Sequence, residues 1–116
     1  MKESITAIIV DDEEHARMNL AVILEEICPE VEILGSASSA VEAAELIENQ
    51  DPELVFLDVM MPGENGFSFL SKIPDRSFSV VFTTAHGEHA LKAIKEDAVD
   101  YLEKPIDPDD LKVAVS

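Results

Sequence analysis

Three carboxylates, a hydroxyl and an ammonium each follow closely after a short apolar run of the sequence. The carboxylates are Asp11, Asp12 and Asp58, the hydroxyl is on Thr84 and the ammonium is on Lys104. An aspartate can attack phosphorus and form an aspartyl phosphate, and such transfer is catalysed mainly by positioning and charge neutralisation. Crowded carboxylates raise the pKa of at least one of them unless a cation lies among them. Hard oxygen ligands suit Mg2+, so these residue types predict a Mg2+-dependent site for phosphoryl transfer.

The elements that must position these residues are visible in the hydrophobic pattern. Short apolar runs occur at Ile5–Val10, 31–34, 54–57, 80–82 and 99–102, the last interrupted by Asp100 and Tyr101. Runs of this length predict strands that are covered on both faces, which is typical of a parallel sheet.

Apolar residues at helical spacing, together with caps and breakers, predict a helix after each strand. The first helix begins at Glu13 and ends at Pro29, and the second begins at Ser39, which forms a capping box with Glu42, and ends before Asp51. The third contains Phe67, Leu70 and Ile73, the fourth contains Leu91, Ile94 and Ala98, and the fifth begins at Asp107 and Pro108.

This alternation predicts an α/β fold in which right-handed helical crossovers join parallel strands. Ligands of such sheets bind at the carboxyl ends of the strands, which is where the five candidate residues lie in the sequence. Residues from distant parts of the chain are therefore expected to converge on one edge of the sheet.

Length and composition limit the possible functions. A chain of 116 residues fits one domain, whose last predicted helix is cut short at Ser116, so we expect the first part of a longer polypeptide. The net charge of -17 repels nucleic acid, so this segment is not expected to bind DNA itself. With one cysteine, Cys28, and no apolar run approaching about 20 residues, we expect a cytoplasmic protein without membrane contact.

Over its whole length the chain resembles the receiver domains of two-component response regulators. The matching segments are 8–13, 57–62 with Gly66 following, 84–85 and 100–105, in this order and at the separations typical of the family. The resemblance implies a flavodoxin-like, doubly wound parallel sheet of five strands in the order 2-1-3-4-5. It also implies a phosphorylation switch rather than an enzyme acting on external substrates.

By the same resemblance, Asp58 would accept a phosphoryl group from a histidine kinase. Asp12 would bind Mg2+ directly and Asp11 would help through water. Asp58 and the backbone carbonyl of Met60 would complete the protein ligands.

The remaining matched residues would sense the phosphate. Thr84 and Lys104 would hold the phosphoryl oxygens, and the peptide bond between Lys104 and Pro105 would be cis. Tyr101 would turn inward when Thr84 is drawn to the phosphate, and this would reshape the surface of the fourth helix, fifth strand and fifth helix, where a homodimer could form. A half-buried strand tyrosine that only packs is the alternative for Tyr101.

Segments 82–86 and 100–107 look more particularly like receivers of the LytTR (AlgR/LytR) group of transcriptional regulators. That resemblance implies a DNA-binding domain beyond Ser116. Met60 and His86 stand at positions that tend to set how fast the phosphate is lost.

Two other functions remain open on the sequence alone. A phosphatase of the haloacid dehalogenase type also uses an aspartyl phosphate, but it needs a second aspartate where Met60 stands. A stand-alone or pseudo-receiver, which acts as an interaction module without phosphate, would not need the acidic pair, Thr84 and Lys104.

Overall fold

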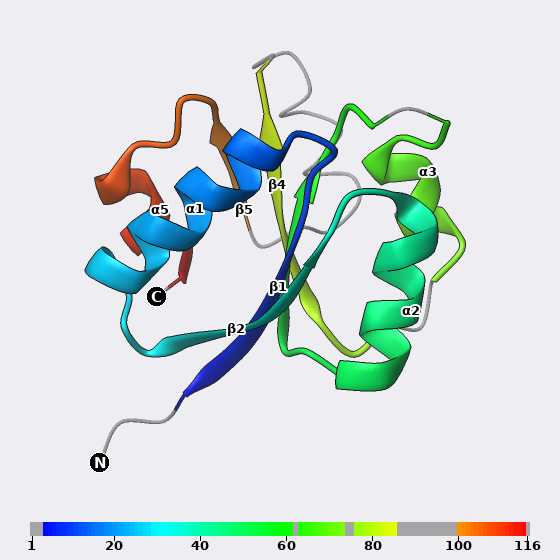
Figure 1. The fold of residues 1–116 in the computed structure, drawn as a ribbon, viewed down its shortest axis with the longest axis horizontal. Helices are drawn as coiled ribbons and strands as arrows, with labels where there is room; N and C mark the ends of the chain where they lie inside the picture. Colours follow the sequence, from blue (N-terminus) through cyan, green and yellow to red (C-terminus); the bar gives the residue numbers. More distant parts are fainter. Residues whose placement is uncertain (1–3, 62, 74–75, 86–99, 116) are drawn as a thin grey trace.

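The sheet contains five parallel strands. The computed structural model describes residues 4–61, 63–73, 76–85 and 100–115. The strands are β1 (Ile5–Val10), β2 (Val31–Ala37), β3 (Leu54–Asp58), β4 (Ser79–Thr84) and β5 (Asp100–Glu103). Their order is β2-β1-β3-β4-β5 and every pair is parallel, which confirms the predicted fold class and topology (Figure 1).

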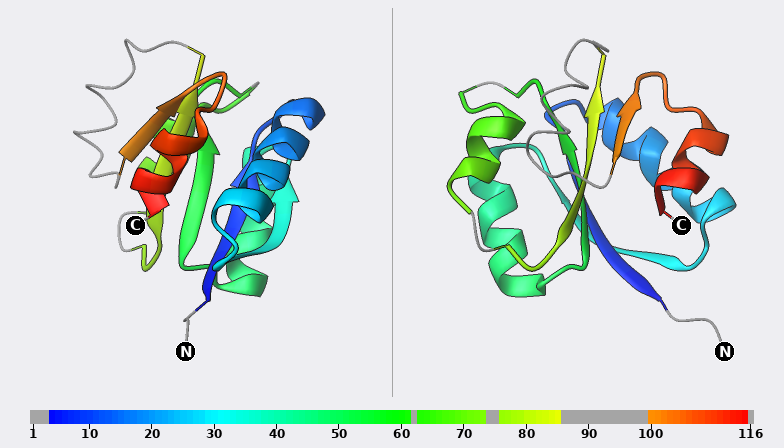
Figure 2. Two further views of the ribbon diagram at one scale, coloured as in Figure 1. Left: turned by 90° about the vertical axis from the view of Figure 1, so that its left-hand side faces the viewer. Right: turned by 180° about the vertical axis from the view of Figure 1, so that it is seen from behind.

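Helices cover both faces of the sheet. They are α1 (Glu14–Ile27), α2 (Ala40–Gln50), α3 (Gly66–Ser71) and α5 (Pro108–Val115). Figure 1 and Figure 2 show α1 and α5 on one face and α2 and α3 on the other. The helix predicted around Leu91, Ile94 and Ala98 lies outside the described residues. None of the helices in the described segments has the length and apolar character needed to cross a membrane.

Strand residues alternate between two apolar cores, which explains the continuous apolar runs. In β3, for example, Phe56 packs with α1 and α5, whereas Leu57 packs with α2 and α3. Both side chains are almost completely buried. The sheet is therefore fixed from both sides, and its carboxyl edge is a rigid platform for polar residues.

The helix starts differ in detail from the capping pattern predicted by the sequence. The Ser39 hydroxyl accepts from the backbone N–H of Glu42 at 3.2 Å, but the Glu42 carboxylate accepts from the backbone N–H and hydroxyl of Ser38, both at 2.8 Å. The reciprocal half of the capping box is thus shifted by one residue. At α5 the predicted cap is confirmed, since Asp107 Oδ1 accepts from the backbone N–H of Asp109 at 2.8 Å.

The start of α3 lies unusually close to the end of β3. Asn65 caps α3, whose last residue is Ser71, so the prediction that Ile73 belongs to this helix is wrong. A Cβ atom added to Gly66 would lie 2.7 Å from the backbone oxygen of Asp58 and 3.2 Å from Leu57 Cγ. Only glycine allows the helix to begin against this backbone.

Gly66→Ala should therefore lower the free energy of unfolding by about 1 to 3 kcal/mol, because backbone atoms near Asp58 must move to admit the methyl group. Urea denaturation measures the loss. Gly35→Ala is the control, since its Cβ would meet only the side-chain end of Leu46, at 3.2 Å, which can turn away. An equal loss in the two variants would contradict the proposed role of the close approach at Gly66.

Candidate functional site

The carboxyl ends of β1 and β3 bring three aspartates together. Asp11 and Asp12 follow β1 directly, and Asp58 is the last residue of the neighbouring strand β3. Each offers a carboxylate oxygen, and these oxygens all lie within 4.8 Å of one another. Asp11 and Asp58 are buried, whereas Asp12 is exposed. Three negative groups at this distance, one of them open to solvent, form a suitable site for a hard divalent cation.

Lys104 supplies a positive charge next to the acids. It follows β5, and its backbone N–H donates to the carbonyl of Thr84 at 2.7 Å. Its Nζ lies 2.7 Å from Asp11 Oδ2 and 3.5 Å from Asp58 Oδ2, and 4.0 Å from Glu13 Oε1. Although burial alone would lower the pKa of Lys104, its bond to Asp11 and the charge of Asp58 raise the pKa above its ordinary value. The ammonium therefore stays charged and bridges two of the three acids.

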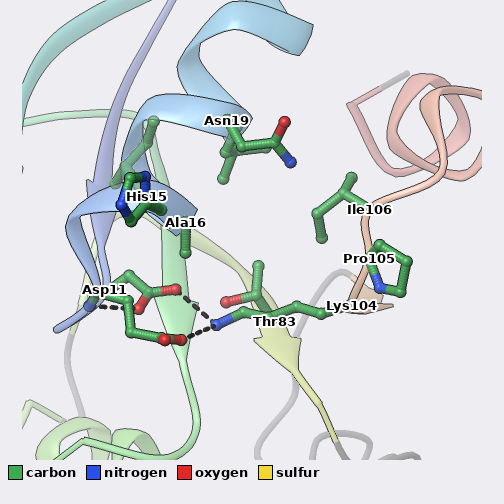
Figure 3. A pocket seen from close by; sticks show the side chains of 11 residues that line it. Asp11, His15, Ala16, Asn19, Thr83, Lys104, Pro105 and Ile106 are labelled. Carbon is green, nitrogen blue, oxygen red and sulfur yellow. Dashed lines mark hydrogen bonds and ion pairs between the residues drawn. The ribbon is translucent and has the colours of Figure 1, made fainter.

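A cavity of about 330 Å³ opens beside Lys104, between α1 and the loop after β5. Figure 3 shows the side chains of Asn19, Ile106 and Thr83 around it, with the lysine reaching across to Asp11. The peptide bond that turns the chain after Lys104, to Pro105, is cis. Of the three clustered aspartates, only Asp11 lines this cavity together with Lys104.

The surroundings of Asp58 change its acidity. Its Oδ1 accepts from the backbone N–H of Met60 at 3.1 Å. Burial, followed by the charge of Asp11, raises the pKa of Asp58 to about 6, against the opposing effects of Lys104 and the Met60 N–H. Burial is the larger cause, and the charge of the crowded neighbour Asp11 adds to it. Above about pH 6 the carboxyl group is ionised beside the charge of Asp11.

Thr84 and Tyr101 share one face of the sheet. The register pairs Phe82 with Tyr101 and Thr84 with Glu103, so strand alternation puts both side chains on the face that carries α2 and α3. Thr84 is buried, and Tyr101 is half-buried against the apolar core on that face. Thr83 points to the opposite face, which it shares with Asp58. The two neighbouring threonines therefore have different environments.

Two contacts of the site were not among the predicted ones. The guanidinium of Arg17 donates to the main-chain carbonyl of Asp11 at 2.7 Å, and Asp11 Oδ1 accepts from the backbone N–H of Glu13 at 3.0 Å. The side chain of Met60 is 52% exposed, so this residue meets the site through its backbone. The sequence signal that could have indicated this contact is the position of Arg17, a basic residue within the acidic start of α1.

Comparison with known proteins shows which family this chain resembles. Residues 7–116 match the model of the response regulator receiver domain. The chain is 40% identical over 112 residues to a response regulatory protein of Vibrio cholerae, covering 96% of this chain and 47% of that protein. It is 43% identical over 104 residues to the transcriptional regulatory protein BtsR of Escherichia coli, covering 89% and 43% of the two chains. The chain thus spans about half the length of these relatives.

Solved structures agree with the observed architecture. A response regulator receiver domain protein from Clostridium thermocellum has a TM-score of 0.83 and 30% sequence identity, and the match covers 96% of this chain and 90% of that one. The sheet order, the acidic residues at the carboxyl edge and the family match over nearly all of the sequence all indicate the same family. The chain belongs to the response regulator receiver domain family of two-component systems.

Proposed function

We propose that this chain is a phosphorylation-dependent switch in which Asp58 accepts a phosphoryl group from a histidine kinase. The observation that carries the proposal is the buried Asp58 carboxylate, which lies beside Asp11 and 3.5 Å from the ammonium of Lys104. Receiver domains in general take their phosphoryl group from a histidine kinase. The whole of residues 1–116 would form this unit, and it would act as a switch without turnover of an external substrate.

The transfer would begin with ionised Asp58. One of its carboxylate oxygens attacks the phosphorus of a phosphohistidine, and the new O–P bond forms as the P–N bond breaks. The electron pair of that bond stays on the imidazole nitrogen of the kinase. Since the pKa of Asp58 is about 6, this carboxyl group is ionised in most molecules at neutral pH.

Mg2+ fits the donor set of the site. The carboxylates of Asp12 and Asp58 and the backbone carbonyl of Met60 would hold it directly, and Asp11 would help through water. When bound, Mg2+ supplies positive charge that neutralises the phosphoryl oxygens. Asp12, which is exposed, leaves one side of the site open to water and phosphate.

Lys104 and Thr84 would then hold the phosphoryl oxygens on Asp58. Lys104 already lies between Asp11 and Asp58, and Thr84 would be drawn toward the phosphate. The space that Thr84 leaves would admit Tyr101, which lies on the same sheet face. The signal would reach the surface formed by β5 and α5, where a homodimer could form; the helix predicted around Leu91, Ile94 and Ala98 also belongs to this prediction but lies outside the described residues.

Phosphorylation should depend on Mg2+. Incubation with acetyl phosphate should add one phosphoryl group to the chain in the presence of Mg2+, because without the cation the acids repel the incoming phosphate. Intact mass spectrometry measures the product, and EDTA should abolish it. Labelling that continues at the same rate in EDTA would remove the metal from the proposal and leave the acceptor to be tested separately.

We further propose that the output is transcriptional and of the LytTR type, through a DNA-binding domain outside this chain. Support comes from the resemblance of segments 82–86 and 100–107, and from the relative that is named a transcriptional regulatory protein. The acidic chain itself would not touch DNA, and it would act in the cytoplasm. The residues encoded after Ser116 test this, since an enzymatic domain there would contradict a transcriptional output.

A further inference from the structure

Arg17 contacts residues 11–13, the connection that carries the proposed metal-binding residues Asp11 and Asp12, in a way that the proposed mechanism does not use. Arg17 lies in the first turn of α1 and is half-buried. Nη1 donates to the main-chain carbonyl of Asp11 at 2.7 Å, and the backbone N–H of Arg17 donates to the carbonyl of Glu13 at 3.1 Å. The helix is thus tied twice to the three-residue connection that carries both acids.

Every polar group of Asp11 has a partner. Its N–H donates to the carbonyl of Ala37 at 3.0 Å, Oδ1 accepts from Glu13, and Oδ2 accepts from Lys104 at 2.7 Å. The Arg17 bond fixes the remaining group, the carbonyl, and with it the peptide plane between Asp11 and Asp12. Since both side chains leave from this short segment, its orientation sets the direction of both carboxylates.

The two basic residues near the acids therefore act on different atoms. The ammonium of Lys104 lies 2.7 Å from Asp11 Oδ2, a carboxylate oxygen of the acidic cluster. The guanidinium of Arg17 bonds to a main-chain carbonyl, so it orients the acids without competing for this oxygen. Charge-assisted hydrogen bonds of this length are strong enough to hold a loop in one conformation.

We propose that Arg17 is a positioning residue that holds Asp11 and Asp12 in the geometry for binding Mg2+. The inference rests on the proposed magnesium site, and it gives the start of α1 a role in the affinity of that site. Coulomb's law alone predicts the opposite effect, because a positive charge near the acids weakens cation binding. The sign of the change on removing Arg17 separates the two explanations.

The test is a titration of the whole chain with Mg2+ alone, followed by calorimetry, with thermal unfolding in EDTA as a measure of the fold. Arg17→Met keeps the apolar stem and should weaken Mg2+ binding by about tenfold, as removal of an outer-shell partner typically does. Lys72→Met is the matched control. It removes the same charge from a side chain that is 69% exposed and paired with Glu64, and it should leave the affinity unchanged within about twofold.

Arg17→Lys keeps the charge but lacks Nη1, and it should also bind Mg2+ more weakly than the natural chain. Because it is the gentler change, it decides the question if Arg17→Met fails to fold in EDTA. Wild-type or tighter affinity in a folded Arg17 variant would overturn the positioning role. A natural chain that does not bind Mg2+ at all would instead overturn the proposed magnesium site and, with it, this inference.

Discussion

Asp58→Asn is expected to abolish phosphoryl acceptance and, at the same time, to stabilise the folded chain at neutral pH. The first effect follows because an amide oxygen is a poor nucleophile toward phosphorus. The second follows from the raised pKa of Asp58, because a group that resists ionisation in the folded chain opposes folding wherever it must be ionised. A functional carboxylate of this kind is held at a cost in stability.

The sign of the pH dependence can be worked out from the two pKa values. The value of Asp58 is 3.8 in the unfolded chain and about 6 in the folded chain, so between these pH values the folded chain binds more protons. The contribution of Asp58 to stability is therefore fully present below about pH 4 and is lost as pH rises through 6. At pH 7 the ionised group costs about 2 to 3 kcal/mol, since one pKa unit corresponds to about 1.4 kcal/mol.

Urea denaturation of both proteins in EDTA from pH 4 to pH 8 measures this difference. The stability of Asp58→Asn should be close to that of the natural chain at the acidic end and exceed it by about 2 to 3 kcal/mol at the basic end. Asp51→Asn is the control, because Asp51 is exposed and asparagine tolerates its left-handed backbone conformation. Labelling of Asp58→Asn by acetyl phosphate would show that another residue is the acceptor. A difference in unfolding free energy that does not change with pH would contradict the raised pKa of Asp58.

Much of the fold could be predicted because strands covered on both faces produce continuous apolar runs. The run at Ile5–Val10 matches β1 at both ends. β2 was predicted only as 31–34 but extends to Ala37, because Gly35 and Ser36 carry no apolar signal although they pair with β1. The strand order was implied by resemblance, since alternating strands and helices fit several orders of a doubly wound sheet.

The candidate acids and Lys104 could be predicted because parallel strands bring their carboxyl ends to one edge. Contacts through the backbone could not, since they depend on local geometry that no residue type announces. The Arg17 bond to the carbonyl of Asp11 and the Met60 N–H bond to Asp58 are of this kind. The magnitude of the pKa change at Asp58 likewise needs the burial and distances of the folded chain.

Lys104→Met is expected to change metal binding and phosphoryl transfer in opposite directions. Without phosphate, the ammonium lies 2.7 Å from Asp11 Oδ2 and competes with a cation for that oxygen. Its removal should tighten Mg2+ binding, and pH 8 suits the test because the pKa of Asp58, about 6 in the natural chain, would rise further without this charge. The same removal takes away a positive charge that faces the phosphoryl oxygens during transfer.

At saturating Mg2+, the initial rate of labelling by acetyl phosphate should fall by about 100-fold or more, the usual effect of removing one charge-stabilising donor from a transfer site. Calorimetric titration with Mg2+ and labelling rates on the same samples measure both effects, with Lys72→Met as the charge-matched control. Weaker Mg2+ binding would show that Lys104 orients the acids rather than competing for them. An unchanged rate would show that Lys104 does not contact the transferring group. Only tighter binding combined with slower transfer fits an ammonium that leaves Asp11 for the phosphate, because one charge then hinders the cation before the reaction and assists the phosphoryl group during it.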